Sequence, residues 1–196
     1  TRNYEGALDA VCDDYGVQRS SVSRQWKAAS TKQLKEMMER RLDDLDLVAM
    51  MIDGVSFHDT LIVAAVGFTV DGTKHVLGLW PGATENTEVC KDLLNDLIER
   101  GLSTERTYLF VLDGSKALHK AVRAVFGERA EVQRCHVHKE RNVISYLPDE
   151  YHHMVRQRLH AAWGMTDYNK AKKALLKLAE YLATLSASAA RSLEEG

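Results

Sequence analysis

Two aspartates stand in the same local setting and could do chemistry together. Asp53 follows the apolar segment 47–52, Asp113 follows the apolar segment 107–112, and a glycine comes next in both cases. Such segments are typical of strands buried on both faces, and open α/β sheets place their sites at the carboxyl ends of these strands. A single Asp-Gly after a strand is commonly only a turn, so the functional interpretation depends on the pair.

Two carboxylates that converge repel each other, which makes them poor structural partners but good ligands for hard divalent cations. A pair of metal ions about 3.5 to 4 Å apart can activate an attacking oxygen and stabilise the leaving one in phosphodiester displacement. We therefore expect Asp53 and Asp113 to be catalytic residues and the ligands of a two-metal site that uses Mg²⁺ or Mn²⁺.

The elements that must position this pair follow from hydrophobic periodicity and turn residues. Asp71-Gly72 predicts a hairpin, and Gly101 and Gly127 predict helix ends. The predicted strands are 47–52, 60–70, 74–80, 107–112 and 130–134, and the predicted helices are 85–100, 115–126 and 135–146. This order is that of an α/β, ribonuclease-H-like fold with a mixed sheet, in which the first and fourth strands are neighbours and the two aspartates converge.

Three segments are predicted along the chain. Residues 1–43 form a small helix-turn-helix-like DNA-binding segment, residues 44–147 the ribonuclease-H-like core, and residues 148–196 a helical segment. Within the first segment we expect helices on both sides of Gly16 and another helix over residues 32–42.

The helix-turn-helix interpretation also rests on local charge. From residue 18 to residue 41 there are seven basic and two acidic residues, a net charge of +5 in a chain of −2. Serine and arginine side chains suit contacts to phosphates and to base edges. The alternative is a helical hairpin with a solvated charged face. The expected DNA-binding residues are Arg19, Ser20, Ser21, Ser23, Arg24 and Lys27.

Composition restricts the possible classes. The sequence of 196 residues is 45% hydrophobic and 28% charged, which is typical of a globular protein. Three scattered cysteines do not indicate a disulfide framework and favour a reducing cytoplasm. No apolar segment approaches the roughly 18 residues of a membrane span, and no signal peptide pattern is present, so we expect no membrane partner.

Four motifs resemble the Mutator-type transposases of bacterial insertion sequences. They are Met-Ile-Asp-Gly-Val at Asp53, Gly-Leu-Trp-Pro-Gly-Ala-Thr-Glu-Asn at Trp80, Val-Leu-Asp-Gly at Asp113, and the Cys-x-x-His signature at Cys135 and His138. The resemblance implies an Asp-Asp-Glu transposase that acts on double-stranded DNA, at transposon ends and target, as a homo-oligomer in the bacterial cytoplasm and nucleoid.

The third carboxylate of that triad is expected beyond the last residue, because the segment after Pro148 resembles the beginning of a long helical insertion. None of Glu150, Glu180, Glu194 and Glu195 has the expected setting, and Glu140 is the only acid near the core. The Cys-x-x-His pair alone is half of a zinc site. We expect Cys135 to be packed and His138 to orient the active site.

Three functions remain open from sequence. The first is a transposase, or a fragment of one, that cleaves and transfers DNA strands at element ends. The second is a catalytically inactive DNA-binding remnant that occupies those ends. The third is a complete nuclease that uses Glu140 as its third carboxylate.

Overall fold

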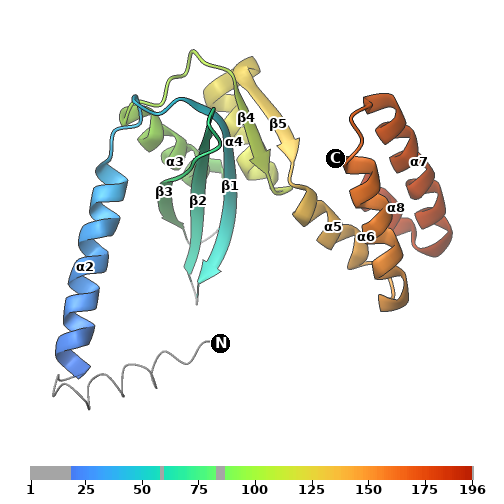
Figure 1. The fold of residues 1–196 in the computed structure, drawn as a ribbon, viewed down its shortest axis with the longest axis horizontal. Coiled ribbons are helices and arrows are strands. Elements are labelled where there is room, and N and C mark those ends of the chain that lie inside the picture. The colour runs from blue at the N-terminus through green and yellow to red at the C-terminus, as the bar shows by residue number, and fades with distance from the viewer. Residues whose placement is uncertain (1–18, 58–59, 83–86, 196) are drawn as a thin grey trace.

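The computed structural model describes residues 19–57, 60–82 and 87–195, and it has an α/β architecture. A protruding helix precedes a sheet, and a group of helices follows it (Figure 1). The strands are β1 (Leu47–Phe57), β2 (Thr60–Thr69), β3 (Lys74–Gly82), β4 (Tyr108–Leu112) and β5 (Ala130–Arg134). The helices are α2 (Arg19–Glu39), α3 (Thr87–Glu99), α4 (Lys116–Phe126), α5 (His136–Ile144), α6 (Asp149–Trp163), α7 (Tyr168–Leu185) and α8 (Ala187–Glu194).

The five strands form one mixed sheet in the order β3-β2-β1-β4-β5. β1, β2 and β3 are an antiparallel meander, whereas β1–β4 and β4–β5 are parallel pairs. A parallel neighbour needs a crossover connection, and α3 and α4 lie in those connections, behind the sheet in Figure 1. The predicted adjacency of the first and fourth strands is therefore confirmed.

β1 is longer than its apolar segment predicts. The prediction ended this strand at residue 52, but β1 continues to Phe57 and pairs with β2 through Phe57↔Thr60. Its parallel pairing with β4 ends at Ile52↔Leu112. Asp53 therefore lies inside a strand and not just after it, because the hairpin partner β2 continues past the point where β4 stops.

The predicted turns and caps around the sheet are confirmed. Gly72 adopts a φ of 83° in the β2–β3 hairpin, a conformation that residues with a Cβ rarely adopt. Asp71 stabilises this turn through its carboxylate, which accepts the Thr73 N–H at 3.0 Å. Gly101 follows α3 with a φ of 105°, and Ser115 caps α4 by accepting the Leu118 N–H at 3.2 Å.

Helix α2 is one continuous helix where two were predicted. It runs from Arg19 to Glu39 and crosses residues 30–31, which separate the predicted helix after Gly16 from the predicted helix over residues 32–42. Those residues include no glycine or proline, and the pairs Lys32–Glu36 and Lys35–Glu39 support the following turns at i, i+4 spacing. The predicted turn at Gly16 and the helix before it lie outside the described residues.

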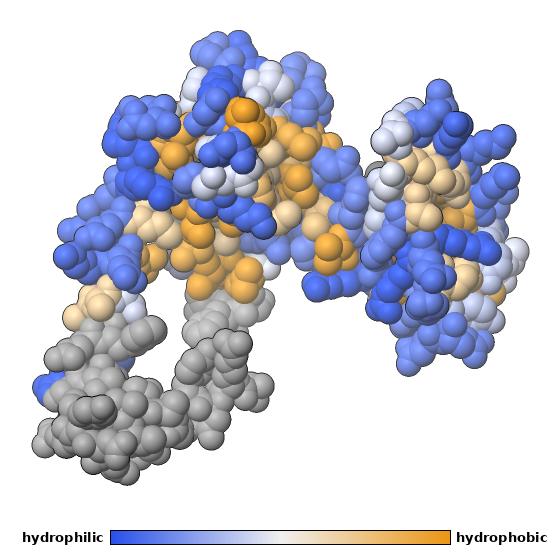
Figure 2. Space-filling view, viewed as in Figure 1, coloured by the Kyte–Doolittle hydropathy of each residue, from blue (hydrophilic) through white to orange (hydrophobic). Residues whose placement is uncertain are grey.

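The described residues form two hydrophobic clusters. The larger one lies between the sheet and α3 and α4, with Met50, Phe110 and Leu97 fully buried. The second joins α5 to α6, α7 and α8 around Val155, Leu159 and other residues. Figure 2 shows apolar surface gathered over the sheet-bearing part, whereas the visible face of the last helices is mostly hydrophilic. None of the described helices is long and apolar enough to cross a membrane.

Candidate active site

The two aspartates lie at the same level of neighbouring strands. Ile52 and Leu112 are the last register partners of the parallel β1–β4 ladder, and Asp53 and Asp113 are the next residues of the two segments. Adjacent strands are about 4.8 Å apart, so the two carboxylate-bearing residues are direct neighbours at the carboxyl end of β4. These backbone positions are compatible with two carboxylates that share a cation.

Local hydrogen bonds orient one of these side chains. Asp113 Oδ1 accepts the backbone N–H of Ser115 at 2.7 Å, which ties the carboxylate to the start of α4. No hydrogen bond or ion pair to Asp113 Oδ2 is found among the described residues. Asp53 and Asp113 are both half-buried, so water and cations can reach them. The arrangement leaves carboxylate oxygens available to a ligand.

The Cys-x-x-His pair lies beside this site because of how α5 begins. The backbone N–H of Cys135 donates to the carbonyl of Leu112 at 2.7 Å, which places the start of α5 next to the end of β4. Cys135 is buried with a free thiol, as expected of a packed cysteine. One turn later, His138 Nε2 lies 3.8 Å from Asp53 Oδ2. That His138 orients the active site stays a prediction, and this distance identifies Asp53 as the side chain that it would orient.

The pair of aspartates fits a divalent cation, because both supply the oxygen ligands that Mg²⁺ and Mn²⁺ prefer. Within residues 19–57, 60–82 and 87–195, no group of three His, Cys, Asp or Glu side chains is arranged to hold a metal. Glu140 is directed elsewhere: its carboxylate contacts Arg156 at 3.1 Å and His160 at 2.5 Å, both on α6. Glu140 is therefore a bridge between α5 and α6.

A basic cavity of about 680 Å³ opens next to Asp113 and was not predicted. The sequence contains a signal for this cavity, because Lys116, Lys120 and Arg123 recur at i, i+4 and i+7. The same spacing is also typical of a solvent-exposed helix face. The residues that line the cavity are Leu112, Asp113, Gly114, Ser115, Lys116, His119, Lys120, Arg123, Val132, Arg134 and Glu195.

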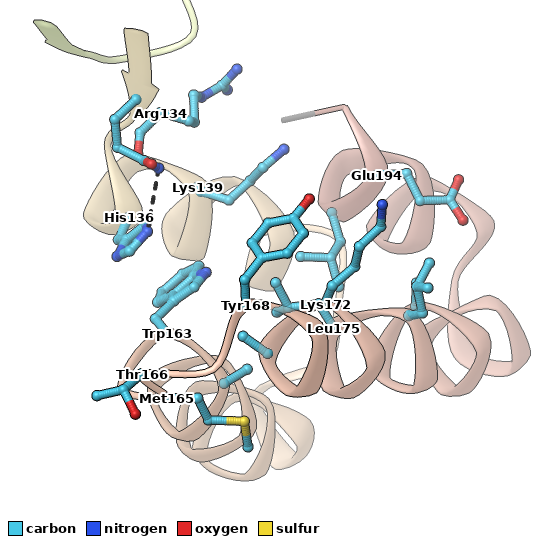
Figure 3. A pocket seen from close by; sticks show the side chains of 16 residues that line it. Arg134, His136, Lys139, Trp163, Met165, Thr166, Tyr168, Lys172, Leu175 and Glu194 are labelled. Atoms are coloured by element: carbon cyan, nitrogen blue, oxygen red, sulfur yellow. Dashed lines mark hydrogen bonds between the residues drawn. The ribbon is translucent and has the colours of Figure 1, made fainter. Parts of the chain in front are cut away.

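A second cavity, of about 560 Å³, lies between α5 and the last three helices (Figure 3). His136 stacks on Trp163 with ring centroids 4.2 Å apart and an interplanar angle of 7°. The Gln133 amide lies 3.4 Å from the His136 ring nitrogen, as the dashed line in Figure 3 shows. Burial, and then the charge of His160, lower the pKa of His136. Burial and the neighbouring His160 thus favour a neutral His136 imidazole.

The predicted DNA-binding residues all lie in the first three turns of α2. Arg24 and Lys27 are exposed. For Arg19, Ser20, Ser21 and Ser23 the structure describes the helical backbone only. Their contact with DNA stays a prediction, and Gly16, the expected turn residue, lies outside the described residues.

Comparison with known proteins identifies relatives of this chain. The family described as "Transposase, Mutator family" matches residues 1–196. The chain is 29% identical over 169 residues to the transposase of insertion sequence element IS6120 from Mycolicibacterium smegmatis, which covers 82% of this chain and 50% of the relative. It is 28% identical over 190 residues to the transposase of IS256 in transposon Tn4001 from Staphylococcus aureus, covering 91% of this chain and 46% of the relative.

The chain thus spans about half the length of these relatives. Among solved structures, a simian T-cell lymphotropic virus intasome in complex with PP2A regulatory subunit B56 gamma is similar at a TM-score of 0.30 and 12% identity, covering 66% of this chain and 48% of that chain. The match of the family over the whole sequence is decisive: the chain belongs to the Mutator family of transposases.

Proposed function

We propose that this chain is the part of a DNA transposase that carries two carboxylates of a metal-dependent strand-cleavage and strand-transfer site on a ribonuclease-H-like core. The observation that carries the proposal is the position of Asp53 and Asp113 directly after Ile52 and Leu112, the last register pair of the parallel strands β1 and β4. Family membership supports it, because the relatives are transposases of insertion elements.

In this function Asp53 and Asp113 would hold Mg²⁺ or Mn²⁺. The bound cations would stabilise the charge that develops on the attacking and leaving oxygens of a phosphodiester. The chain's own contribution is positioning. The Ser115 N–H fixes one oxygen of Asp113, and the link from Cys135 to Leu112 keeps α5 and His138 beside Asp53.

The DNA partners of this function are the element ends and the target duplex. The exposed side chains of Arg24 and Lys27 on the protruding α2 support a role of that helix in binding the ends. We expect the active form to be a homo-oligomer at the bacterial nucleoid, because strand transfer of an element engages two ends and a target. The order of the strands supports the ribonuclease-H-like interpretation of the core.

The test uses the whole transposase to which this chain belongs, with duplexes that carry the terminal repeats of its element and with Mg²⁺ or Mn²⁺ added. Asp53→Asn and Asp113→Asn should each abolish strand cleavage and leave duplex binding unchanged. The matched control is Asp71→Asn, since Asp71 is also followed by glycine but serves only the β2–β3 turn. Cleavage that persists in both active-site variants would refute the proposal.

A second function, binding of element ends without catalysis, is favoured by one observation. The described residues place no third carboxylate beside the aspartates, and Glu140 is bound to Arg156 and His160. This function predicts salt-sensitive end binding that survives Asp53→Ala and weakens on Arg24→Ala. End binding without any metal-dependent cleavage would support it, and cleavage abolished by Glu140→Gln would instead support the nuclease alternative.

A further inference from the structure

One face of helix α4 is basic and begins beside the candidate active site. Lys116, Lys120 and Arg123 lie at i, i+4 and i+7, which places them on the same side of the helix. His119 belongs to the same side. Lys116, His119 and Lys120 are exposed, and α4 contains no acidic residue. We call Lys116, Lys120 and Arg123 together with Arg134 the α4 track.

Arg134 extends the α4 track to the aspartate. It comes from the end of β5 and lines the 680 Å³ cavity together with the residues of α4 and with Asp113. Its guanidinium lies so close to Gly114 that a Cβ on that glycine would be 2.0 Å from Arg134 Nη2. Arg134 Nε is buried and has no hydrogen-bond partner among the described residues. The Arg134 guanidinium in this cavity therefore has an Nε–H group without a hydrogen-bond acceptor among the described residues.

The other side chains of the α4 track are also uncompensated. Among the described residues no ion pair or hydrogen bond is found for the side chains of Lys116 and Lys120, and Arg123 donates only to the Gly127 carbonyl. Two acids line the cavity, Asp113 and Glu195, and neither forms an ion pair with any side chain that the structure describes. Elsewhere cations are commonly paired with carboxylates, as for Lys32, Lys35, Lys91, Arg106, Arg129 and Arg156. The track is thus open to an external anion.

We propose that the α4 track binds the phosphate backbone of one strand of duplex DNA and leads that strand to Asp53 and Asp113. This inference rests on the proposed function, since it supplies a surface for the DNA substrate. Lys116 and Arg123 are separated by about 10 Å along the helix axis. One DNA strand carries a phosphate for about every 3.4 Å of duplex axis, so the track is long enough to contact more than one phosphate of a strand.

The test measures binding of a fluorescently labelled 30-base-pair duplex of arbitrary sequence to the full chain by fluorescence anisotropy, between 50 and 200 mM KCl. The variant is Lys116→Ala with Lys120→Ala. The matched control is Lys173→Ala with Lys177→Ala on α7, which are also exposed, also four residues apart, and without an ion pair among the described residues. Equal melting temperatures of the variants exclude a folding defect.

The α4 variant should reduce the slope of log affinity against log salt by about 1.8, or about 0.9 for each phosphate that a lysine no longer neutralises. Between 50 and 200 mM KCl, the affinity of the variant then decreases by a factor that is about twelve times smaller than the factor for the wild type. The α7 control should keep the wild-type slope. Equal slopes in all three proteins, or equal reductions in both variants, would overturn the inference.

Two further measurements separate the possible sources of a result. Inorganic phosphate at constant ionic strength should not displace the duplex, and displacement at 10 mM phosphate would show an isolated anion site and overturn the strand path. Asp53→Asn should keep the wild-type salt slope. If the slope is insensitive to the α4 lysines while cleavage still requires Asp53, the inference fails and the proposed function stands. If the α4 lysines set the slope but cleavage does not require Asp53, the proposed function fails.

Discussion

Arg100 connects helix α2 to the body of the protein, and Arg100→Met should loosen that connection. The residue is only 8% exposed, and its Nη2 lies 2.8 Å from Asp96 Oδ2. The same guanidinium donates to the backbone carbonyls of Leu77 in β3, at 2.6 Å, and of Met37 in α2, at 3.3 Å. One side chain thus holds three elements together.

The magnitude follows from what each partner loses. The methionine side chain still fills the space of the aliphatic stem but donates nothing. Leu77 is left out of the β2–β3 register, where Ala65 pairs with Gly78 and Val66 with Val76, so its carbonyl depends on Arg100. An unsatisfied buried acceptor costs about 1–3 kcal/mol, and breaking a buried ion pair costs about 3–5 kcal/mol.

Asp96 lowers this sum, because its side chain is 23% exposed and regains some hydration when Arg100 is replaced. We expect the free energy of unfolding to fall by about 3 kcal/mol, which is about 140-fold in the unfolding equilibrium constant. Urea unfolding followed by circular dichroism measures this decrease. Hydrogen exchange of the second half of α2 measures whether the helix has become detached.

Arg106→Met is the matched control. Arg106 Nη2 lies 2.6 Å from Asp46 Oδ1, but the two side chains are 46% and 66% exposed, so its replacement should destabilise the protein much less than Arg100→Met does. Equal decreases in Arg100→Met and Arg106→Met would refute the reasoning. Unchanged hydrogen exchange in α2 would show that other interactions, such as the Met38 sulfur that accepts the Leu79 N–H, hold that helix.

Three other substitutions test particular interactions. Gly114→Ala should displace the Arg134 guanidinium and cost only about 1 kcal/mol in stability, because the new Cβ meets the end of a flexible side chain. It should also weaken duplex binding as Arg134→Ala does. Additive effects on duplex binding in the double variant would contradict this shared cause. Gly67→Ala should cost about 1–3 kcal/mol in urea unfolding, because its Cβ would lie 2.6 and 2.9 Å from two buried leucine side chains. The pKa of His136 is lowered in the folded protein, so folded His136 binds a proton less tightly than His136 of the unfolded chain. The stability of the protein should therefore fall as the pH drops below about 6.5 toward the folded pKa. His136→Gln should reduce this loss of stability in thermal melts measured from pH 8 to pH 5.

The regular elements of the core could be predicted because their signals are local. Continuous apolar segments predicted β1 and β4, and glycine and serine at the expected positions predicted the ends of α3 and α4. The adjacency of β1 and β4 followed from the order of the elements. The helices after Pro148 were predicted for the same reason, since amphipathic periodicity is visible without knowledge of any partner.

The errors and omissions share a physical cause, which is dependence on a partner distant in sequence. Residues 53–57 do not continue the apolar segment without interruption, and they form a strand because β2 pairs with them. The basic residues of α4 resemble a solvated helix face, and only the fold places them in one cavity with Arg134 and Asp113. Arg100 similarly resembled an ordinary end of a helix.

The three Asp-Gly pairs of the chain show how far local sequence determines structure. Gly72 needs its positive φ of 83°, so the dipeptide there is a turn. Gly54 lies within β1 and pairs with Val63, so the dipeptide at Asp53 is part of a strand. The dipeptide at Asp113 serves a third purpose: Gly114 has no Cβ, and this makes room for the guanidinium of Arg134. The same two residues therefore serve three purposes, and a functional assignment of Asp53 or Asp113 depends on their neighbours across the sheet rather than on the dipeptide.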